Sequence, residues 1–277
     1  MSTIARADES ASRFLSASDW NILHDMKSEP IVLLFALAFL PASAQSPTQS
    51  ADVTVDVATI RPHPADIHHN NFEFSGNRFI LEDQSIFKLI SYAYSLNARQ
   101  IIDAPQWAQE QHYDLSGTTN LTKDATVPQQ QQIIRQLLER RLGLHFHREK
   151  RELPVYALQI VKGQPKLKPA ANPSDKPMEI DDGHGMQTER TFTNTTITDF
   201  VTRMQFFVDR PLVDQTGLTG RYDFQLTYTY GNAPSEEPNA APLLFTAIQE
   251  QLGLKLQAKK APIDVFVIEH IEQPTQN

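Results

Sequence analysis

The chain has 277 residues, of which 40% are hydrophobic and 21% are charged, and its formal net charge is −8. These proportions are ordinary for a globular protein that buries a core. The acidic balance argues against a general nucleic-acid or anionic-membrane binder, because either function needs a basic face. The sequence contains no cysteine, which excludes disulfides, thiolate catalysis and thiolate metal sites.

An apolar run near the N-terminus predicts export to the periplasm or the extracellular space. Residues 31–40 read IVLLFALAFL, and Ala42-Ser43-Ala44 follows as a small-residue cleavage site. The run is shorter than the ~20 residues that span a bilayer, so no transmembrane segment is expected after cleavage. We interpret 26–44 as a signal peptide and 1–25 as an upstream extension from a mis-called start codon. An amphipathic N-terminal helix ending near Asp25 is the alternative interpretation of 1–25.

Strand and helix patterns alternate along the mature chain. The elements expected in the first half, in chain order, are a strand over 53–57, a loop over 63–71, a strand over 79–81, a helix over 86–94, strands over 101–102 and 113–115, a helix over 127–142, and strands over 144–147 and 155–160. Ser85 is expected to cap the first helix, Pro128 to lie in the first turn of the second, and Gly143 to end it. Pro154 is expected to mark a turn between the last two strands.

The second half repeats this alternation after a polar segment. Residues 163–187 are rich in Pro, Lys, Asp and Gly, which indicates a linker or a long surface loop. The elements expected after it are a strand at Phe192, a helix over 197–207, strands over 212–213 and 222–228, a helix over 243–252, and strands over 254–256 and 265–268. Gly217 and Gly220 are expected to supply positive φ angles in a tight turn between two strands. This turn lacks the Lys-Ser/Thr ending of a phosphate-binding loop.

The two halves match in order and nearly in spacing, which predicts an internal repeat. Five positions of the first half correspond to five of the second at one constant offset, which we name the repeat offset; they are Asp83, Ile86, Leu89, Ile90 and Asp103, matched to Asn194, Ile197, Phe200, Val201 and Asp214. Two short motifs also recur at nearly this offset: Tyr113-Asp114 as Tyr222-Asp223, and Leu142-Gly143-Leu144 as Leu252-Gly253-Leu254. Each unit is expected to run strand–helix–strand–strand–helix–strand–strand. The expected fold class is α+β, with mainly antiparallel sheet and helices packed on one face. Unit 1 is expected over 45–168, a linker or long loop over 169–187, and unit 2 over 188–277.

Several motifs along the mature chain carry a family resemblance. They are Ile60-Arg-Pro62, the 86–94 helix, Trp107, Tyr113-Asp114, Leu153-Pro-Val-Tyr-Ala157, the Val213–Phe224 block that contains Thr-Gly-Leu-Thr-Gly-Arg-Tyr-Asp-Phe, and Ala247–Leu256. Together they resemble the soil-associated (acidobacterial) exported protein family of unknown function, which carries domain of unknown function 3738. The resemblance implies an exported protein and supplies no catalytic residues. Some members resemble C-terminal attachments of membrane sensor-type zinc peptidases, but this chain has no His-Glu-x-x-His, so that activity does not transfer.

Histidines are the only candidates for metal chemistry. Alternation would place His145 and His147 on one face of a strand, and His63, His68 and His69 are further potential ligands. A metal site also needs converging geometry, which spacing alone does not show. We interpret His145 and His147 as polar positions on the outer face of a half-exposed strand, and we expect no metal and no cofactor. No Gly-x-Ser-x-Gly and no other catalytic constellation is present.

Five residues around the repeated motif are weak candidates for ligand binding, and they are Asp103, Trp107, Asp214, Arg221 and Tyr222. Asp103 and Asp214 would act as a pair of acids only if the two units faced each other, and hydrogen bonding within their loops is the better interpretation. Trp107 is a candidate for ligand stacking, although packing at the edge of a core is the simpler interpretation.

These observations favour a non-enzymatic exported module that binds an envelope protein or a glycan. Two alternatives stay open. The helix–Leu-Gly-Leu–strand pattern is similar to the ring-building domains of secretins and TonB-dependent receptors, an analogy at the level of fold only. The other alternative is a metal-dependent hydrolase that uses His145 and His147.

Overall fold

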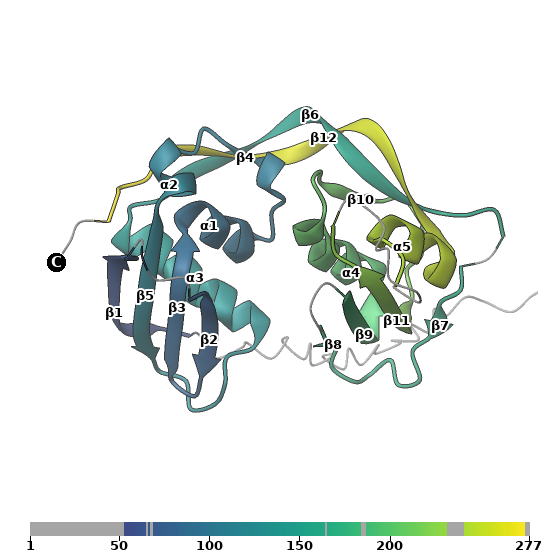
Figure 1. The fold of residues 1–277 in the computed structure, drawn as a ribbon, viewed down its shortest axis with the longest axis horizontal. Coiled ribbons are helices and arrows are strands. Elements are labelled where there is room, and N and C mark those ends of the chain that lie inside the picture. The colour runs from purple at the N-terminus through teal and green to yellow at the C-terminus, as the bar shows by residue number, and fades with distance from the viewer. Residues whose placement is uncertain are drawn as a thin grey trace, which may run out of the picture. The chain divides into compact units, whose positions relative to one another are not determined.

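The computed structural model describes residues 53–64, 66, 69–163, 165–183, 187–231 and 241–274. They belong to one compact unit, Ser50–Asn277. The expected signal peptide and upstream extension, together with His68, lie outside the described residues. Helices and antiparallel-rich sheets are mixed throughout this unit, which confirms the α+β class (Figure 1).

Groups of strands alternate with helices along the chain (Figure 1). They are β1 (Val55–Pro62), β2 (Asn71–Ser75), β3 (Arg78–Ser85), α1 (Ile86–Tyr94), η1 (Ala98–Gln100), β4 (Ile101–Ile102), α2 (Gln106–Glu110), β5 (His112–Thr119), α3 (Val127–Arg141), β6 (His145–Ile160), β7 (Lys168–Pro169), β8 (Met178–Asp181), β9 (Gln187–Thr196), α4 (Ile197–Met204), η2 (Gln205–Phe207), β10 (Leu212–Asp214), β11 (Arg221–Thr229), α5 (Leu244–Leu252) and β12 (Leu254–His270).

Three four-stranded sheets organise these elements, in the orders β1-β5-β3-β2, β10-β6-β12-β4 and β7-β11-β9-β8. The first sheet, with α1, α2 and α3, forms what we name the N-lobe, and the third, with α4 and α5, forms the C-lobe. Each lobe has its own hydrophobic core. The antiparallel pair β6–β12 contributes residues to both cores, so the second sheet joins the lobes (Figure 1).

The helix starts are set by local capping, as the sequence predicts. Ser85 Oγ accepts the backbone N–H of Lys88 at 3.2 Å, and Thr196 Oγ1 accepts that of Asp199 at 3.1 Å. The α3 helix starts at Val127 with proline in its first turn. Gly253 ends α5 in the left-handed conformation, with φ 67°.

Two pairs of short strands predicted from the sequence are in fact two long strands, β6 and β12. The expected turn at Pro154 is wrong, because Pro154 pairs with Lys260 inside the β6–β12 ladder. Backbone groups alternate between the two sides of a strand, and the N–H of Tyr156 donates to Pro211 O on the β10 side at 2.9 Å. The backbone nitrogen of Pro154 faces the same side as that of Tyr156. β10 begins opposite Tyr156 and does not extend as far as Pro154. Its missing donor therefore costs no ladder hydrogen bond.

Several short elements were not predicted. β2 begins at Asn71, inside the expected loop, and β7 and β8 lie within the expected linker. The short helix α2, with Pro105 as its N-cap, was not expected either. The expected turn at Gly217 and Gly220 connects β10 and β11, which belong to different sheets. Gly217 has φ +70°, as expected. The expected positive φ at Gly220 is wrong; a side chain is disfavoured there because a Cβ would lie 2.9 Å from Tyr222 Oη.

Two positions related by the repeat offset share an unusual backbone geometry. Asp83 and Asn194 have positive φ angles of 57° and 51°. The N–H of Asp83 donates to Asp114 Oδ1 at 3.0 Å, and that of Asn194 donates to Asp223 Oδ1 at 2.7 Å. Likewise β4 pairs in parallel with β12, and β10 pairs in parallel with β6. These correspondences accord with the expected repeat, whose origin in a duplication stays a prediction.

The Asp223 carboxylate gives this turn a testable pH dependence. Hydrogen bonds from the backbone N–H groups of Asn194 and Ala171 hold the pKa of Asp223 below its usual range. The folded pKa is thus below the unfolded one, so the carboxylate stabilises the fold above the unfolded pKa. That contribution is lost as the pH falls through the folded pKa. We expect Asp223→Asn to lower the free energy of unfolding at pH 7, and its difference from the wild type to shrink as the pH is lowered below 4.

Urea unfolding at a series of pH values measures this difference. Asp56→Asn, at an exposed position, is the matched control for the change of charge. A difference between the wild type and Asp223→Asn that stays constant from pH 7 to pH 3 would contradict the prediction.

Candidate ligand-binding cleft

The histidines predicted as weak metal candidates lie on exposed strand positions. His145 and His147 are both exposed on β6, and His147 Nδ1 lies 2.8 Å from Glu269 Oε1. The rings of His145 and His270 are 6.3 Å apart. Within the described part of the chain, no three His, Asp or Glu side chains are grouped in a way that could hold a metal ion.

A histidine–aspartate cluster forms elsewhere, in the N-lobe. His63 Nδ1 lies 2.6 Å from Asp114 Oδ1, and His112 Nδ1 bonds to Asp83 Oδ1. The cluster connects β3 and β5 with the residue that follows β1. It includes Asp83, which has a positive φ angle. It does not include His69, which lies 3.6 Å from Glu82.

The five candidates for ligand binding lie at separate places in the two lobes. Asp214 Oδ1 accepts the N–H and the hydroxyl of Thr216, each at 2.8 Å, which agrees with the loop interpretation. Asp103 adopts φ 58° after β4. Trp107 packs against the N-lobe core, edge to face with Tyr113.

The remaining two candidates lie at the start of β11. Arg221 Nη1 donates to Asn194 O at 2.9 Å, so the guanidinium supports the turn before α4. The Tyr222 ring packs against the C-lobe core. Neither residue lines the cavity described next.

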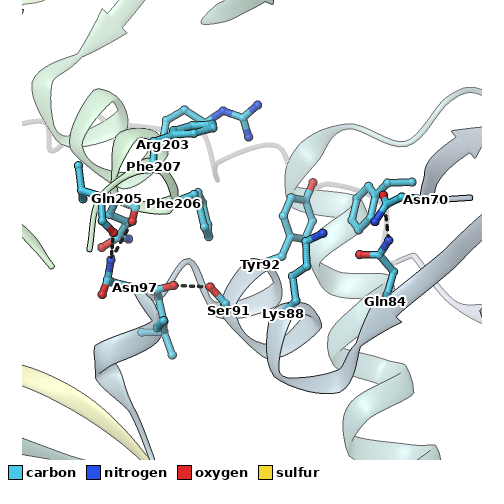
Figure 2. Close-up of a pocket in the computed structure, with 14 residues that line it drawn as sticks. Asn70, Gln84, Lys88, Ser91, Tyr92, Asn97, Arg203, Gln205, Phe206 and Phe207 are labelled. Carbon is cyan, nitrogen blue, oxygen red and sulfur yellow. Dashed lines mark hydrogen bonds between the residues drawn. The ribbon is translucent and has the colours of Figure 1, made fainter. Parts of the chain in front are cut away.

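A cavity of about 410 Å³ lies between α1 of the N-lobe and the α4–η2 segment of the C-lobe. We name it the Gln84 cavity, and its main lining residues are Phe72, Gln84, Lys88, Tyr92, Arg203 and Phe206. Figure 2 shows Gln84, Lys88 and Tyr92 on one wall and Arg203, Phe206 and Phe207 on the other. This volume is within the usual range for small-molecule and side-chain pockets.

The amide of Gln84 presents an unpaired acceptor to this cavity. Gln84 is completely buried, and its Nε2 donates to Glu82 O at 2.7 Å and to Asn70 Oδ1 at 3.2 Å. A flipped amide would place its oxygen against these acceptors, so the observed orientation is fixed. The Oε1 atom has no hydrogen-bond partner among the described residues, and Figure 2 shows it directed toward the Lys88 side of the cavity. Leaving such an acceptor unpaired costs roughly 1–3 kcal/mol, which a donor on a ligand would recover.

Aromatic rings form much of the cavity wall. Phe72 meets Tyr92 edge to face at 4.9 Å between centroids, and Tyr92 lies 6.4 Å from Phe206 across the cleft. The Tyr92 hydroxyl donates to Gln130 Oε1 at 2.6 Å, and burial raises the pKa of this phenol. Tyr92 therefore stays neutral and presents its ring, not a charge, to the cleft.

Two cations flank the rings, but only one is neutralised. Arg203 Nε lies 2.8 Å from Glu179 Oε2. Lys88 is exposed on α1, and no ion pair engages its ammonium within the described ranges. The Gln84 cavity thus offers a free cation, a free acceptor and apolar faces.

The two walls are held together by a buried amide. Asn97 is 3% exposed, and its Nδ2 donates to Gln205 O and Val208 O, each at 2.9 Å. Arg99 Nε adds a bond to Asp209 O at 2.6 Å. These bonds fix the end of α1 against η2, so the cleft is largely preformed.

The sequence contained little that marked these residues. Gln84 is an ordinary polar residue in a strand pattern, and Phe206 follows the apolar stripe of α4. The one signal in the sequence is the repeat offset, because it makes positions on α1 correspond to positions on α4, and these two helices form the opposite walls of the cavity.

Comparison with known proteins identifies the family. The sequence profile described as "Protein of unknown function (DUF3738)" matches residues 87–271. The chain belongs to this family. The match begins inside α1, yet β1 and β3 pair with β5, so the folded DUF3738 protein extends to the N-terminal side of the matched range. No curated protein and no solved structure matches.

Family membership bears out the domain of unknown function named by the resemblance. The soil-associated, acidobacterial origin stays a prediction. Among the described residues of this DUF3738 protein, no helix has the length and apolar character needed to cross a membrane.

Proposed function

We propose that this protein is an exported, non-enzymatic binding module of the cell envelope, with the Gln84 cavity as its ligand site. The observation that carries the proposal is the unpaired, completely buried Oε1 of Gln84 in a cavity walled by aromatic rings. Export is supported by the signal-like sequence over 26–44.

The chemistry of the lining groups supports binding rather than reaction. An amide oxygen, an ammonium group and aromatic rings recognise a ligand by hydrogen bonding, charge and stacking. The ligand that fits them carries an N–H or O–H donor, an apolar or aromatic body and an anionic group. The ring-building alternative and the hydrolase alternative have no specific observation in their favour, so neither is proposed.

The test is saturable binding of defined amides to the mature chain, residues 45–277. N-acetyl-phenylalanine and N-acetyl-tryptophan combine an amide N–H, an aromatic ring and a carboxylate. We expect both to shift NMR signals of the cleft residues, and Gln84→Met to weaken binding about tenfold, the worth of one hydrogen bond.

Phe206→Ala, at a half-buried position on the opposite wall, is a second variant that leaves the Gln84 bonds intact. It is expected to weaken binding by a similar factor. Trp107→Phe, outside the cavity, is the control and is expected to bind as the wild type does. Absence of saturable binding, or equal affinity of all four proteins, would refute the proposal.

A further inference from the structure

A second cavity shares three of its lining residues with the first. It has a volume of about 390 Å³, and Tyr92, Arg203 and Phe206 line both cavities. We name it the Asp199 cavity; its other lining residues include Val127, Met178, Glu179, Asp199 and Thr202. The two cavities therefore form the two ends of one cleft.

The two cavities are built from corresponding positions of the two lobes. At the repeat offset, Lys88, Ser91 and Tyr92 on α1 correspond to Asp199, Thr202 and Arg203 on α4, and all six line the cleft. The edge strand β2 borders one cavity, and the edge strand β8 borders the other.

The ends of the cleft nevertheless carry opposite charges. Arg203, which lines both cavities, pairs with Glu179, which lines the Asp199 cavity. The charged groups outside this ion pair are the ammonium of Lys88 in the Gln84 cavity and the carboxylate of Asp199 in the Asp199 cavity. Asp199 Oδ2 accepts from the Thr196 cap at 2.7 Å, which leaves its second oxygen and its charge available. A ligand that spans the cleft therefore has one preferred orientation.

Three of the six exposed large hydrophobic side chains among the described residues line this cleft. Phe72 is 37% exposed, Val127 50% and Met178 51%, and each lines one of the cavities. Among the described strands, β2 pairs only with β3, and β8 pairs only with β9, so each has a backbone edge open to an added strand.

We propose that the cleft binds a single extended peptide segment with an acidic residue at one end, apolar side chains in the middle and a basic residue at the other. This inference rests on the proposed function and names its ligand class. A peptide supplies the N–H donor for Gln84 Oε1, apolar side chains for the rings, and backbone groups for an edge strand. Its acidic residue lies at Lys88, and its basic residue lies at Asp199.

The test uses two capped eight-residue peptides with the same composition. One has Glu near its N-terminus, two Phe in the middle and Lys near its C-terminus; the other has Glu and Lys exchanged. At about 3.3 Å per residue an extended octapeptide reaches roughly 26 Å, enough to cover neighbouring side-chain pockets. Titration calorimetry at low salt is expected to show one peptide binding about tenfold more tightly than the other, a preference that shrinks at 0.5 M salt.

The double variant Lys88→Glu with Asp199→Lys conserves the net charge and is expected to reverse this preference. Because Asp199 also caps α4, Lys88→Met alone is the second variant; it is expected to reduce the preference without touching the cap. Equal affinities of the two peptides for the wild type, or a preference that both variants leave unchanged, would overturn the inference.

The outcomes separate this inference from the proposed function. Saturable binding of the N-acetyl aromatic amino acids without binding of either peptide overturns the peptide inference and leaves the binding function standing. Failure of every probe to bind overturns both.

Discussion

Replacing Arg190 by leucine is expected to lower the free energy of unfolding by about 3–5 kcal/mol, the cost of removing one partner from a buried ion pair. The Arg190 side chain is 2% exposed, and its Nη1 lies 2.6 Å from Glu179 Oε1. Its guanidinium also pairs with Asp181, bonds to the Tyr228 hydroxyl at 3.2 Å, and stacks 4.3 Å from the Phe207 ring centre. Leucine would leave the β8 carboxylates without their main cation. Urea unfolding with linear extrapolation measures the loss.

Arg151→Leu is the matched control for this substitution. Arg151 pairs with Glu149 on β6, and both side chains are well exposed, at 43% and 38%. Exposed pairs contribute at most about 1 kcal/mol. A loss for Arg190→Leu no larger than the loss for Arg151→Leu would contradict the structural role of Arg190. Glu179 pairs with Arg203 as well as with Arg190. Arg190→Leu is therefore also expected to weaken ligand binding in the cleft.

Phe200→Ala is expected to destabilise the protein by about 3–5 kcal/mol, because it opens a cavity in the core of the C-lobe. Phe200 is 1% exposed on the inner face of α4 and meets Phe192 and Phe224 edge to face, each at 5.4 Å. The lost ring removes both of these contacts and a large apolar surface. Thermal or urea unfolding of residues 45–277 measures the change.

Phe245→Ala provides the comparison. Phe245 is 40% exposed on α5 and meets one ring edge to face, that of Tyr156 at 4.9 Å. We expect a loss of about 1 kcal/mol or less, in line with the small burial of this side chain. Similar losses for the two phenylalanine variants would show that the C-lobe core is not packed around Phe200.

Much of the local structure was predictable from the sequence, because short-range physics determines it. Apolar stripes at helical spacing, the N-cap Ser85 and the first-turn Pro128 predict α1 and α3 closely. Strand alternation predicts β11 closely, but it predicts only the beginning of β1, which continues to Pro62. These signals depend on the periodicity of each element, not on its neighbours.

The errors have a common physical cause, which is that strand continuity depends on neighbouring strands. Pro154 interrupts a ladder only where a partner strand needs its N–H, and β10 does not reach that point. In the same way β8 is held by Arg190 and by pairing with β9, and neither contact is visible in a Pro-rich segment.

The candidate site was not predictable by composition or motif. The residues that the sequence motifs favour, such as Asp214 and Trp107, stabilise a loop and a core edge. Gln84 and Phe206 lie in different halves of the sequence, and only packing of α1 against η2 brings them to one cavity.

The sequence by itself determined the acidic, cysteine-free composition, the α+β class, the limits of α1 and α3 and the constant offset between corresponding positions of the two halves. The tertiary structure decided that β6 and β12 are continuous and join two cores, and that an unpaired amide oxygen and opposite charges line one cleft. The reason is physical. Caps and periodicity act over a few residues, whereas a cavity and its charge balance arise only when distant segments pack together.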